Sequence, residues 1–314
     1  MSEKVAIRHA AIIGATGPTG IHLARELAGR GTAVRAVSRS AANLERSFAG
    51  LDVAHIVADA MDADATRRAV DGCDVVFDCI GLPAEHMGLH PVTARTITEA
   101  AAATGSRCLQ VSSFWSYLPA DEPTVNEGSR REGGNHYIRM RREAEDVVTA
   151  AGGAVLQLPD FFGPEVRASS FQRLLEEAVR GDTVSWIGSP DIDRDYAYVP
   201  DAMRVAADLA GRTEAYGSRW VLGGCGALSA RRAVEIAEGH LGKKLKLRAA
   251  PPWLLKIMSL FSAELRSFMP MVPHYAKPIA YDEARLAELI GPIERTVYAA
   301  AIPETLDWIS RNVR

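Results

Sequence analysis

The sequence predicts an α/β protein with a doubly wound parallel sheet, because short apolar runs alternate with helical segments through the first half of the chain. The strand-like runs lie at 10–13, 33–37, 53–57, 75–80, 109–111 and 155–158. Helical segments lie at 63–71, 91–104 and 136–151, and another follows the first strand. Strands that are apolar on both faces require helices on both sides of the sheet.

The composition of the chain bears on its partners, its location and its use of metal. The chain has 314 residues and a net charge of −3, which gives no attraction to nucleic acid or to an anionic membrane, so we expect neither as a partner. The sequence shows no signal-peptide pattern and no apolar run of about 18 residues, so we expect a cytoplasmic protein. Four cysteines without CxxC spacing indicate reduced thiols and no metal centre: Cys73, Cys79, Cys108 and Cys225.

The alternation ends after residue 158, which predicts a second structural unit. We expect a dinucleotide-binding core over 1–165 and a mixed region over 166–314. In that region, 195–210 and 299–312 return to the core, and a smaller substrate-binding subdomain takes about 166–194 and 217–292. Residues 181–194 are predicted to be rich in turns. The run 253–271 is apolar at helical spacing, which fits a core or substrate-lid helix, or else a helix for a partner or membrane surface.

A glycine-rich loop joins the first strand to the first helix. Gly14, Gly17 and Gly20 recur every three residues in a strand–loop–helix frame, which is typical of a Rossmann-type dinucleotide site. Gly14 allows the tight turn, Gly17 lets the backbone approach a pyrophosphate, and Gly20 lets the helix pack against the strand. Pro18 suits the first helical turn, and the free N–H groups of that turn can bind phosphate.

The end of the second strand indicates which cofactor is bound. An NAD site usually has an acidic residue there to hold the ribose 2′-hydroxyl, but this sequence has Ser38, Arg39 and Ser40. An arginine can pair with a 2′-phosphate. We therefore expect NADP, with NAD the less favoured cofactor.

These motifs resemble those of the extended and atypical short-chain dehydrogenase/reductases, the NAD-dependent epimerase/dehydratase-like family. The loop at 14–20 carries the resemblance together with 57–60, 111–113, 137–145, 158–164, 194–201 and 301–309. It implies a Rossmann-type fold over nearly the whole chain, oxidoreductase chemistry and a homodimer that pairs through the tyrosine-bearing helix. With the loop and strand-end arguments, the expected cofactor residues are Gly14, Thr16, Gly17, Pro18, Thr19, Gly20, Ser38, Arg39, Asp59, Ala60, Cys79, Ile80, Gly81, Ser112, Pro159, Asp160 and Phe161.

The resemblance also implies the catalytic positions. Tyr137 and Arg141 correspond to the family's YxxxK pair and share one helix face at i and i+4. Arg141 replaces the lysine, and Ser113 is our preferred equivalent of the substrate-positioning serine. A tyrosine that acts as a base near pH 7.5 needs its pKa lowered by roughly 2.5 from about 10, whereas a proton donor needs only the neutral phenol. An imperfect lysine substitute therefore favours reduction.

Other residues bear on the substrate. Phe114, Trp115, His86 and Phe162 follow strand ends, where ligands of such sheets bind, and Arg194 matches a family position that contacts the diphosphate of nucleotide sugars. Arginines near Tyr137 fit either a solvated helix face or a site for an anionic substrate. We predict an NADPH-dependent reductase of a carbonyl, or an activated C=C bond, in a small molecule. The alternatives are an NADP-binding sensor without turnover and a nucleotide-sugar epimerase or dehydratase.

Overall fold

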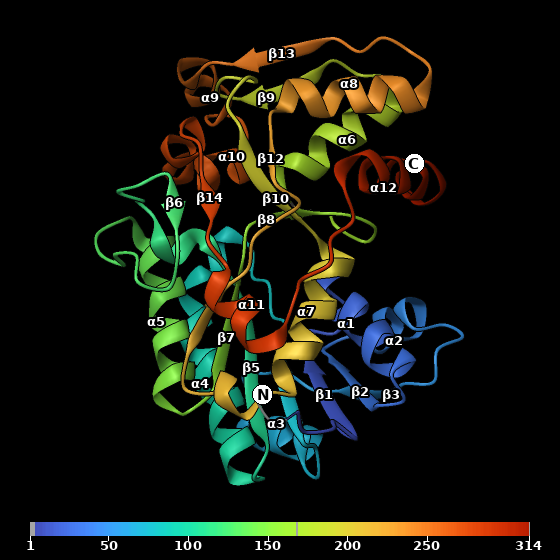
Figure 1. Cartoon of the computed structure of the whole chain (residues 1–314), viewed down its shortest axis with the longest axis vertical. Helices are drawn as coiled ribbons and strands as arrows, with labels where there is room; N and C mark the ends of the chain where they lie inside the picture. The colour runs from blue at the N-terminus through green and yellow to red at the C-terminus, as the bar shows by residue number, and fades with distance from the viewer. Residues whose placement is uncertain (1–3, 168, 314) are drawn as a thin grey trace.

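The computed structural model describes residues 4–167 and 169–313, and it has one large parallel sheet with helices on both faces (Figure 1). The strand order is β11-β7-β5-β4-β1-β2-β3, and every neighbouring pair runs parallel. The strands are β1 His9–Ile13, β2 Ala33–Ser38, β3 Ala54–Val57, β4 Val75–Asp78, β5 Arg107–Ser113, β7 Ala154–Leu158 and β11 Arg219–Val221. This confirms the doubly wound α/β prediction.

The alternation of side chains along β1 explains the two helical layers. Ala10 and Ile12 lie in one buried cluster, with residues of α1 and α7, whereas Ala11 and Ile13 lie in another, with residues of α3, α4 and α5. The helices around the sheet are α1 Pro18–Gly29, α2 Ala41–Ser47, α3 Ala63–Val70, α4 His90–Ala103, α5 His136–Ala150, α7 Val199–Ala210 and α11 Ala284–Ile290. The order of strands reverses beside β1, and ligands of such sheets bind at that point, outside the carboxyl ends of the strands.

The remaining elements form a smaller unit beyond the carboxyl ends of the sheet (Figure 1). Its strands are β8 Asp160–Phe162, β10 Arg194–Tyr198 and β12 Ala227–Leu228 in one sheet, with two-stranded pairs β9 Val184–Ile187 with β13 Leu247–Ala250, and β6 Thr124–Val125 with β14 Ala280–Tyr281. Its helices are α6 Ser170–Arg180, α8 Ala230–Leu241, α9 Pro252–Met258, α10 Ala263–Phe268 and α12 Tyr298–Asn312. The 3-10 segments are η1 Ala84–Leu89, η2 Phe114–Tyr117, η3 Thr213–Ala215 and η4 Met269–Ala276.

The structure divides the chain differently from the expected boundaries. The helix expected to return to the core at 299–312 is α12, and its buried residues pack with those of α6 and α8 in the smaller unit. Conversely, β11 lies within the expected substrate subdomain but completes the large sheet beside β7. Trp220 on β11 is buried in the main core, which is why this short strand pairs there.

Two local expectations also differ. The stretch 181–194, predicted to be rich in turns, contains strand β9. The run 253–271 is not one helix: α9 ends at Met258, and α10 begins after Ser262, whose hydroxyl accepts a hydrogen bond from the backbone N–H of Leu265. Among the described residues, no helix is long and apolar enough to cross a bilayer.

Candidate functional site

The glycine loop lies where β1 meets β4 and leaves no space for a side chain at Gly14 or Gly20. Gly14 has a φ of +80°, and a Cβ there would lie 2.9 Å from the backbone carbonyl of Cys79. A Cβ on Gly20 would lie 2.6 Å from the Cα of Ala15. Gly17 caps α1 with ordinary backbone angles, and no side chain accepts a hydrogen bond from the first turn of the helix. The N–H groups of that turn therefore remain available to an anion.

The end of β2 lies beside this loop. Thr16 Oγ1 and Ser38 Oγ form a hydrogen bond of 3.1 Å, which ties the loop to the strand. Arg39 is exposed, and its guanidinium makes no hydrogen bond or ion pair within residues 4–167 and 169–313. Asp59 is also exposed and its carboxylate accepts the backbone N–H of Met61. Arg39 is therefore free to meet a phosphate.

Helix α5 carries Tyr137 and Arg141 on one face. Its first turn is fixed by Asn135, which accepts the backbone N–H of Ile138 and donates from Nδ2 to the carbonyl of Pro270 at 3.0 Å. Tyr137 is half-buried and packs at the edge of an apolar cluster that includes Trp115. The helix thus places a phenol between the large sheet and the smaller unit.

Arg141 is anchored from α4. Its Nη2 lies 3.1 Å from His90 Nε2, and its Nε is buried without a hydrogen-bond partner among the described residues. Burial lowers the pKa of Arg141, and burial together with the positive Arg141 lowers the pKa of His90 to about 2. His90 is therefore neutral, and its Nε2 accepts from the guanidinium.

Two buried carboxyl groups lie near Arg141. Asp78, at the end of β4, accepts Gln110 Nε2 at 2.8 Å and the backbone N–H of Ile80 at 3.1 Å. Glu145, one turn beyond Arg141 on α5, accepts the hydroxyl of Ser112 and pairs with Arg131 at 2.9 Å. Burial raises the pKa of both carboxyl groups. The expected cofactor residue Ser112 thus holds α5 against β5.

This polar layer was not predicted from the sequence. Residues 137, 141 and 145 recur at four-residue spacing, so the shared helix face of Glu145 was visible in the sequence. The role of His90 was not visible, because its partner lies on a different helix. The remaining members, Gln157 and Ser116, are joined by a hydrogen bond of 2.8 Å from Gln157 Nε2 to Ser116 Oγ.

The arginines around Tyr137 have different partners. Arg142 is buried and donates to backbone carbonyls of residues 116, 118, 132 and 133, so it fixes the loop before α5. Arg131 pairs with two acids of α5, Arg130 pairs with exposed acids, and Arg139 donates to the carbonyl of Gly134. Of this group, Arg141 is the one directed toward the ends of β4 and β5.

The residues after β5 form the apolar side of the site. Ser113 caps η2, and its hydroxyl accepts the backbone N–H of Trp115 at 3.3 Å. Phe114 is 1% exposed and packs edge-on against Tyr281 at 5.9 Å between ring centroids, whereas Trp115 is half-buried. Trp115 and Ser113 therefore face the site more openly than Phe114.

Strand β8 carries Asp160, another of the expected cofactor residues. Tyr275 donates its hydroxyl to Asp160 Oδ1 at 3.1 Å, and Asp160 Oδ2 is buried without a hydrogen-bond partner in the described part of the chain. Burial raises the pKa of Asp160. Arg194 is 2% exposed, donates to the carbonyls of His274 and Lys277 at 3.0 and 2.8 Å, and stacks over Tyr275.

Of the expected substrate contacts, Phe162 and Arg194 are enclosed by the protein, whereas His86 is open to solvent. Phe162 has no exposed surface and packs with Phe171 inside the smaller unit, so its ring does not line an open site. His86 is exposed on η1. Nη1 of Arg194 is occupied by two backbone carbonyls, whereas its Nε is buried without a hydrogen-bond partner among the described residues.

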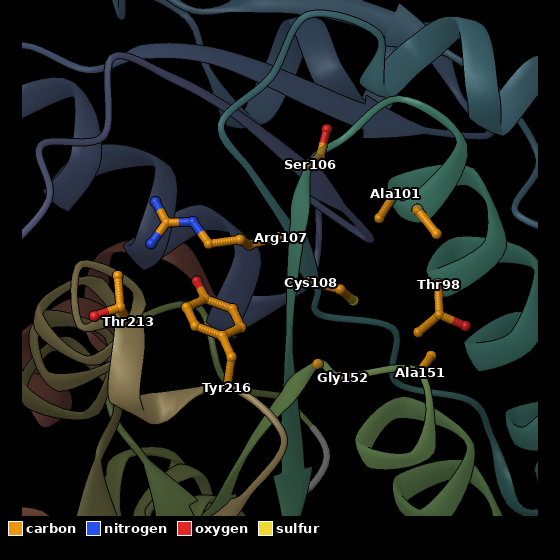
Figure 2. Close-up of a pocket in the computed structure, with 11 residues that line it drawn as sticks. Thr98, Ala101, Ser106, Arg107, Cys108, Ala151, Gly152, Thr213 and Tyr216 are labelled. Carbon is orange, nitrogen blue, oxygen red and sulfur yellow. The ribbon is translucent and has the colours of Figure 1, made fainter.

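A cavity of about 220 Å³ lies at the other end of the sheet, where β5 and β7 begin. Figure 2 shows Arg107 and Tyr216 on one side of β5 and Thr98, Ala101 and Ala151 on the other. None of the expected site residues lines this cavity. It is therefore separate from the glycine loop and from Tyr137.

Comparison with known proteins agrees with the geometry of the loop. Residues 14–154 match the model of a family described as NAD(P)H-binding. The chain is similar in structure to the UDP-glucuronic acid 4-epimerase of Bacillus cereus solved with NAD, with a TM-score of 0.80, 15% identity, and coverage of 98% of this chain and 100% of the epimerase. The chain has the same overall fold as this epimerase.

Two further structures support the same fold. An epimerase of Methanothermobacter thermautotrophicus gives a TM-score of 0.82 at 16% identity, over 97% of this chain and 93% of that one. The dTDP-glucose 4,6-dehydratase of Bacillus anthracis, solved with NAD, gives 0.80 at 12% identity over 97% of each chain. No curated protein sequence matches the chain. The expected fold and an NAD(P)H-binding domain over residues 14–154 are thus confirmed.

The residues of the loop fit a dinucleotide. The cradle at Gly14 and Gly17 would be filled by Cβ atoms, and the uncapped start of α1 supplies N–H donors to a pyrophosphate. The unpartnered Nε of Arg141 lies at the same edge of the sheet and can donate to a ribose hydroxyl. The cofactor, when bound, supplies or accepts a hydride.

Proposed function

We propose that this protein is an NADPH-dependent oxidoreductase that reduces the carbonyl of a small organic substrate. The observation that carries the proposal is the placement of Tyr137 and the half-buried Arg141 on one face of α5, at the edge of the sheet that holds the glycine loop. A phenol beside a fixed positive charge is the arrangement expected of a proton donor in this fold.

The proposed preference for NADP over NAD rests on Arg39. Its guanidinium has no partner within the described residues and follows the strand end where an NAD site needs an acid. The neighbouring Ser38 hydroxyl, held by Thr16, is a second donor for a 2′-phosphate. These residues favour NADP over NAD.

In the proposed reaction, each residue has one role. NADPH, when bound, would supply the hydride for the carbonyl carbon, and the Tyr137 hydroxyl would give its proton to the carbonyl oxygen, so that the products are an alcohol and NADP⁺. Arg141 holds the nicotinamide ribose and stabilises the tyrosinate that remains. Ser113 donates a hydrogen bond to the substrate oxygen, and Trp115 forms an apolar wall of the site.

Nucleotide-sugar chemistry is the second candidate. The Bacillus cereus epimerase and the Bacillus anthracis dehydratase are named for UDP-glucuronic acid and dTDP-glucose, and this chain shares their fold. The burial of Arg194 against backbone carbonyls weakens that candidate, because this residue is the expected diphosphate contact.

The test is cofactor turnover on a substrate panel. Purified protein is incubated with NADPH or NADH and a series of aldehydes, ketones and enones, and the loss of absorbance of the reduced cofactor is followed. We expect oxidation of NADPH with a carbonyl substrate and slower oxidation of NADH. Conversion of UDP-glucuronic acid or dTDP-glucose without net cofactor loss would support the second candidate, and tight NADPH binding without any turnover would support a sensor.

A further inference from the structure

Four large apolar side chains on α9 and in the turn after it are exposed to solvent. The exposed fractions of Trp253, Ile257, Leu260 and Phe261 are 65%, 48%, 67% and 87%. Trp253 and Ile257 lie one turn apart on α9, and Leu260 and Phe261 follow in the turn after it, whereas Leu255 of α9 is 4% exposed. Exposed aromatic and aliphatic residues grouped in this way mark an interaction surface.

The same part of the chain has a strongly basic sequence. Residues 239–263 contain no Asp or Glu and five basic residues, namely Lys243, Lys244, Lys246, Arg248 and Lys256. The whole chain has a net charge of −3, so the remainder carries −8. Lys243 donates to the carbonyl of Val179 and Lys244 pairs with Glu238. The side chains of the other three make no hydrogen bond or ion pair among the described residues.

The basic and apolar residues lie at the same end of the molecule. Lys246 and Arg248 are in or next to β13, which ends at Ala250, and α9 begins two residues later. Figure 1 shows β13 and α9 together at the end of the smaller unit that is farthest from the large sheet. We call Trp253, Ile257, Leu260 and Phe261, with Lys246, Arg248 and Lys256, the α9 surface.

We propose that the α9 surface docks the protein on an anionic lipid surface. The apolar side chains enter the boundary between headgroups and acyl chains, and the basic side chains meet the anionic headgroups, as in helices that lie in a membrane interface. The net charge of the chain hides this property, because it averages the positive segment 239–263 with the negative remainder of the sequence. A second copy of the chain is a poor occupant, because a two-fold contact would bring the same positive charges together.

The proposal is tested by sedimentation with lipid vesicles. The full chain is mixed with vesicles of phosphatidylcholine, alone or with added phosphatidylglycerol. We expect binding to the vesicles that contain phosphatidylglycerol, and weaker binding as salt increases. The double variant Trp253→Ser/Phe261→Ser should lower the partition coefficient at least tenfold. Arg248→Gln and Lys256→Gln should each lower it roughly fivefold.

Matched controls separate docking from general surface changes. Val297 is 63% exposed, so Val297→Ser removes an apolar residue of similar exposure outside the α9 surface. Arg68 is an exposed basic residue on α3, so Arg68→Gln removes a charge elsewhere. Both controls should bind vesicles like the wild type, and all variants should keep the wild-type thermal transition and NADPH affinity.

Three results would overturn the proposal. The first is equal sedimentation with and without phosphatidylglycerol, or unchanged binding of Trp253→Ser/Phe261→Ser. The second is a wild-type dimer that this variant dissociates, with no vesicle binding, which would assign the surface to a second copy. The third is binding to polyglutamate but not to vesicles, which would assign it to an acidic protein.

Discussion

Arg141 on α5 donates a hydrogen bond of 3.1 Å to Nε2 of His90 on α4. This contact fixes the His90 tautomer, since the accepting nitrogen carries no proton and the ring proton must lie on Nδ1. It also directs a buried guanidinium toward the carboxyl ends of β4 and β5. The lysine expected from the family resemblance is therefore replaced by a residue that the surrounding structure holds in place.

Substitution of Arg141 tests whether its charge or its shape is required. Arg141→Met removes the charge and leaves His90 without its donor, so we expect kcat/KM to fall at least tenfold with the best carbonyl substrate. Arg141→Lys restores the charge and should recover most of that loss. Steady-state kinetics of the two variants measure the difference, and equal activity of both with the wild type would remove Arg141 from the mechanism.

The stability of the protein should depend on His90 in acid. The folded pKa of His90 is about 2 and its ordinary value is 6.5, so between these values the unfolded chain binds a proton that the folded chain does not. Stability should thus fall as pH drops below about 6.5, by up to roughly 1.4 kcal/mol per pH unit from this residue. In urea unfolding, the free energy of unfolding of His90→Gln should fall less steeply with decreasing pH than that of the wild type.

The control for this effect is His86→Gln. His86 is exposed and makes no hydrogen bond with Arg141 in the described part of the chain, so its substitution should leave the loss of stability in acid as in the wild type. If His90→Gln and the wild type lose stability equally between about pH 6.5 and pH 4, then His90 is not the group that the folded state keeps neutral.

Alanine substitutions at two glycines of the cofactor loop should have different effects, one on NADPH binding and the other on stability. Gly17 has a φ of −79° and open space around it, and a Cβ there would lie 3.4 Å from its nearest neighbour, so Gly17→Ala should fold normally but bind NADPH more weakly. A Cβ on Gly20 would lie 2.6 Å from Ala15, so Gly20→Ala should lower the free energy of unfolding by about 1–3 kcal/mol. Titration calorimetry and urea unfolding distinguish the two, and full NADPH affinity in Gly17→Ala would argue against the proposed pyrophosphate position.

Arg39 should set the choice between NADPH and NADH. A hydrogen bond to a charged group contributes about 1.5–3 kcal/mol, so Arg39→Gln should weaken NADPH binding roughly tenfold to a hundredfold and leave NADH nearly unchanged. Arg68→Gln provides the matched control on the surface of α3. An equal loss of affinity for NADPH and NADH in Arg39→Gln would show that Arg39 does not bind the 2′-phosphate.

Local patterns predicted the sheet and the cofactor loop, because both depend on short-range rules. Apolar runs marked six strands of the large sheet, and three spaced glycines marked the turn before α1. The seventh strand, β11, has only three residues, and its pairing with β7 depends on the burial of Trp220, which no local pattern shows.

The candidate site was less predictable for a related reason. Tyr137 and Arg141 share a helix and were found by spacing, whereas His90 and Asp78 reach Arg141 from other elements. The positions of Phe162 and Arg194 were assigned from short motifs, but their burial is set by packing across the smaller unit. Residues that meet only after folding leave no spacing to read in the sequence.

The most direct test of the account compares Tyr137→Phe with the wild type on the best carbonyl substrate. The variant removes one hydroxyl and keeps the ring, so NADPH affinity should stay within about twofold, while kcat should fall by roughly a hundredfold or more. That result would support Tyr137 as the proton donor in hydride transfer. Unchanged kcat in a variant that binds NADPH normally would contradict the proposed mechanism.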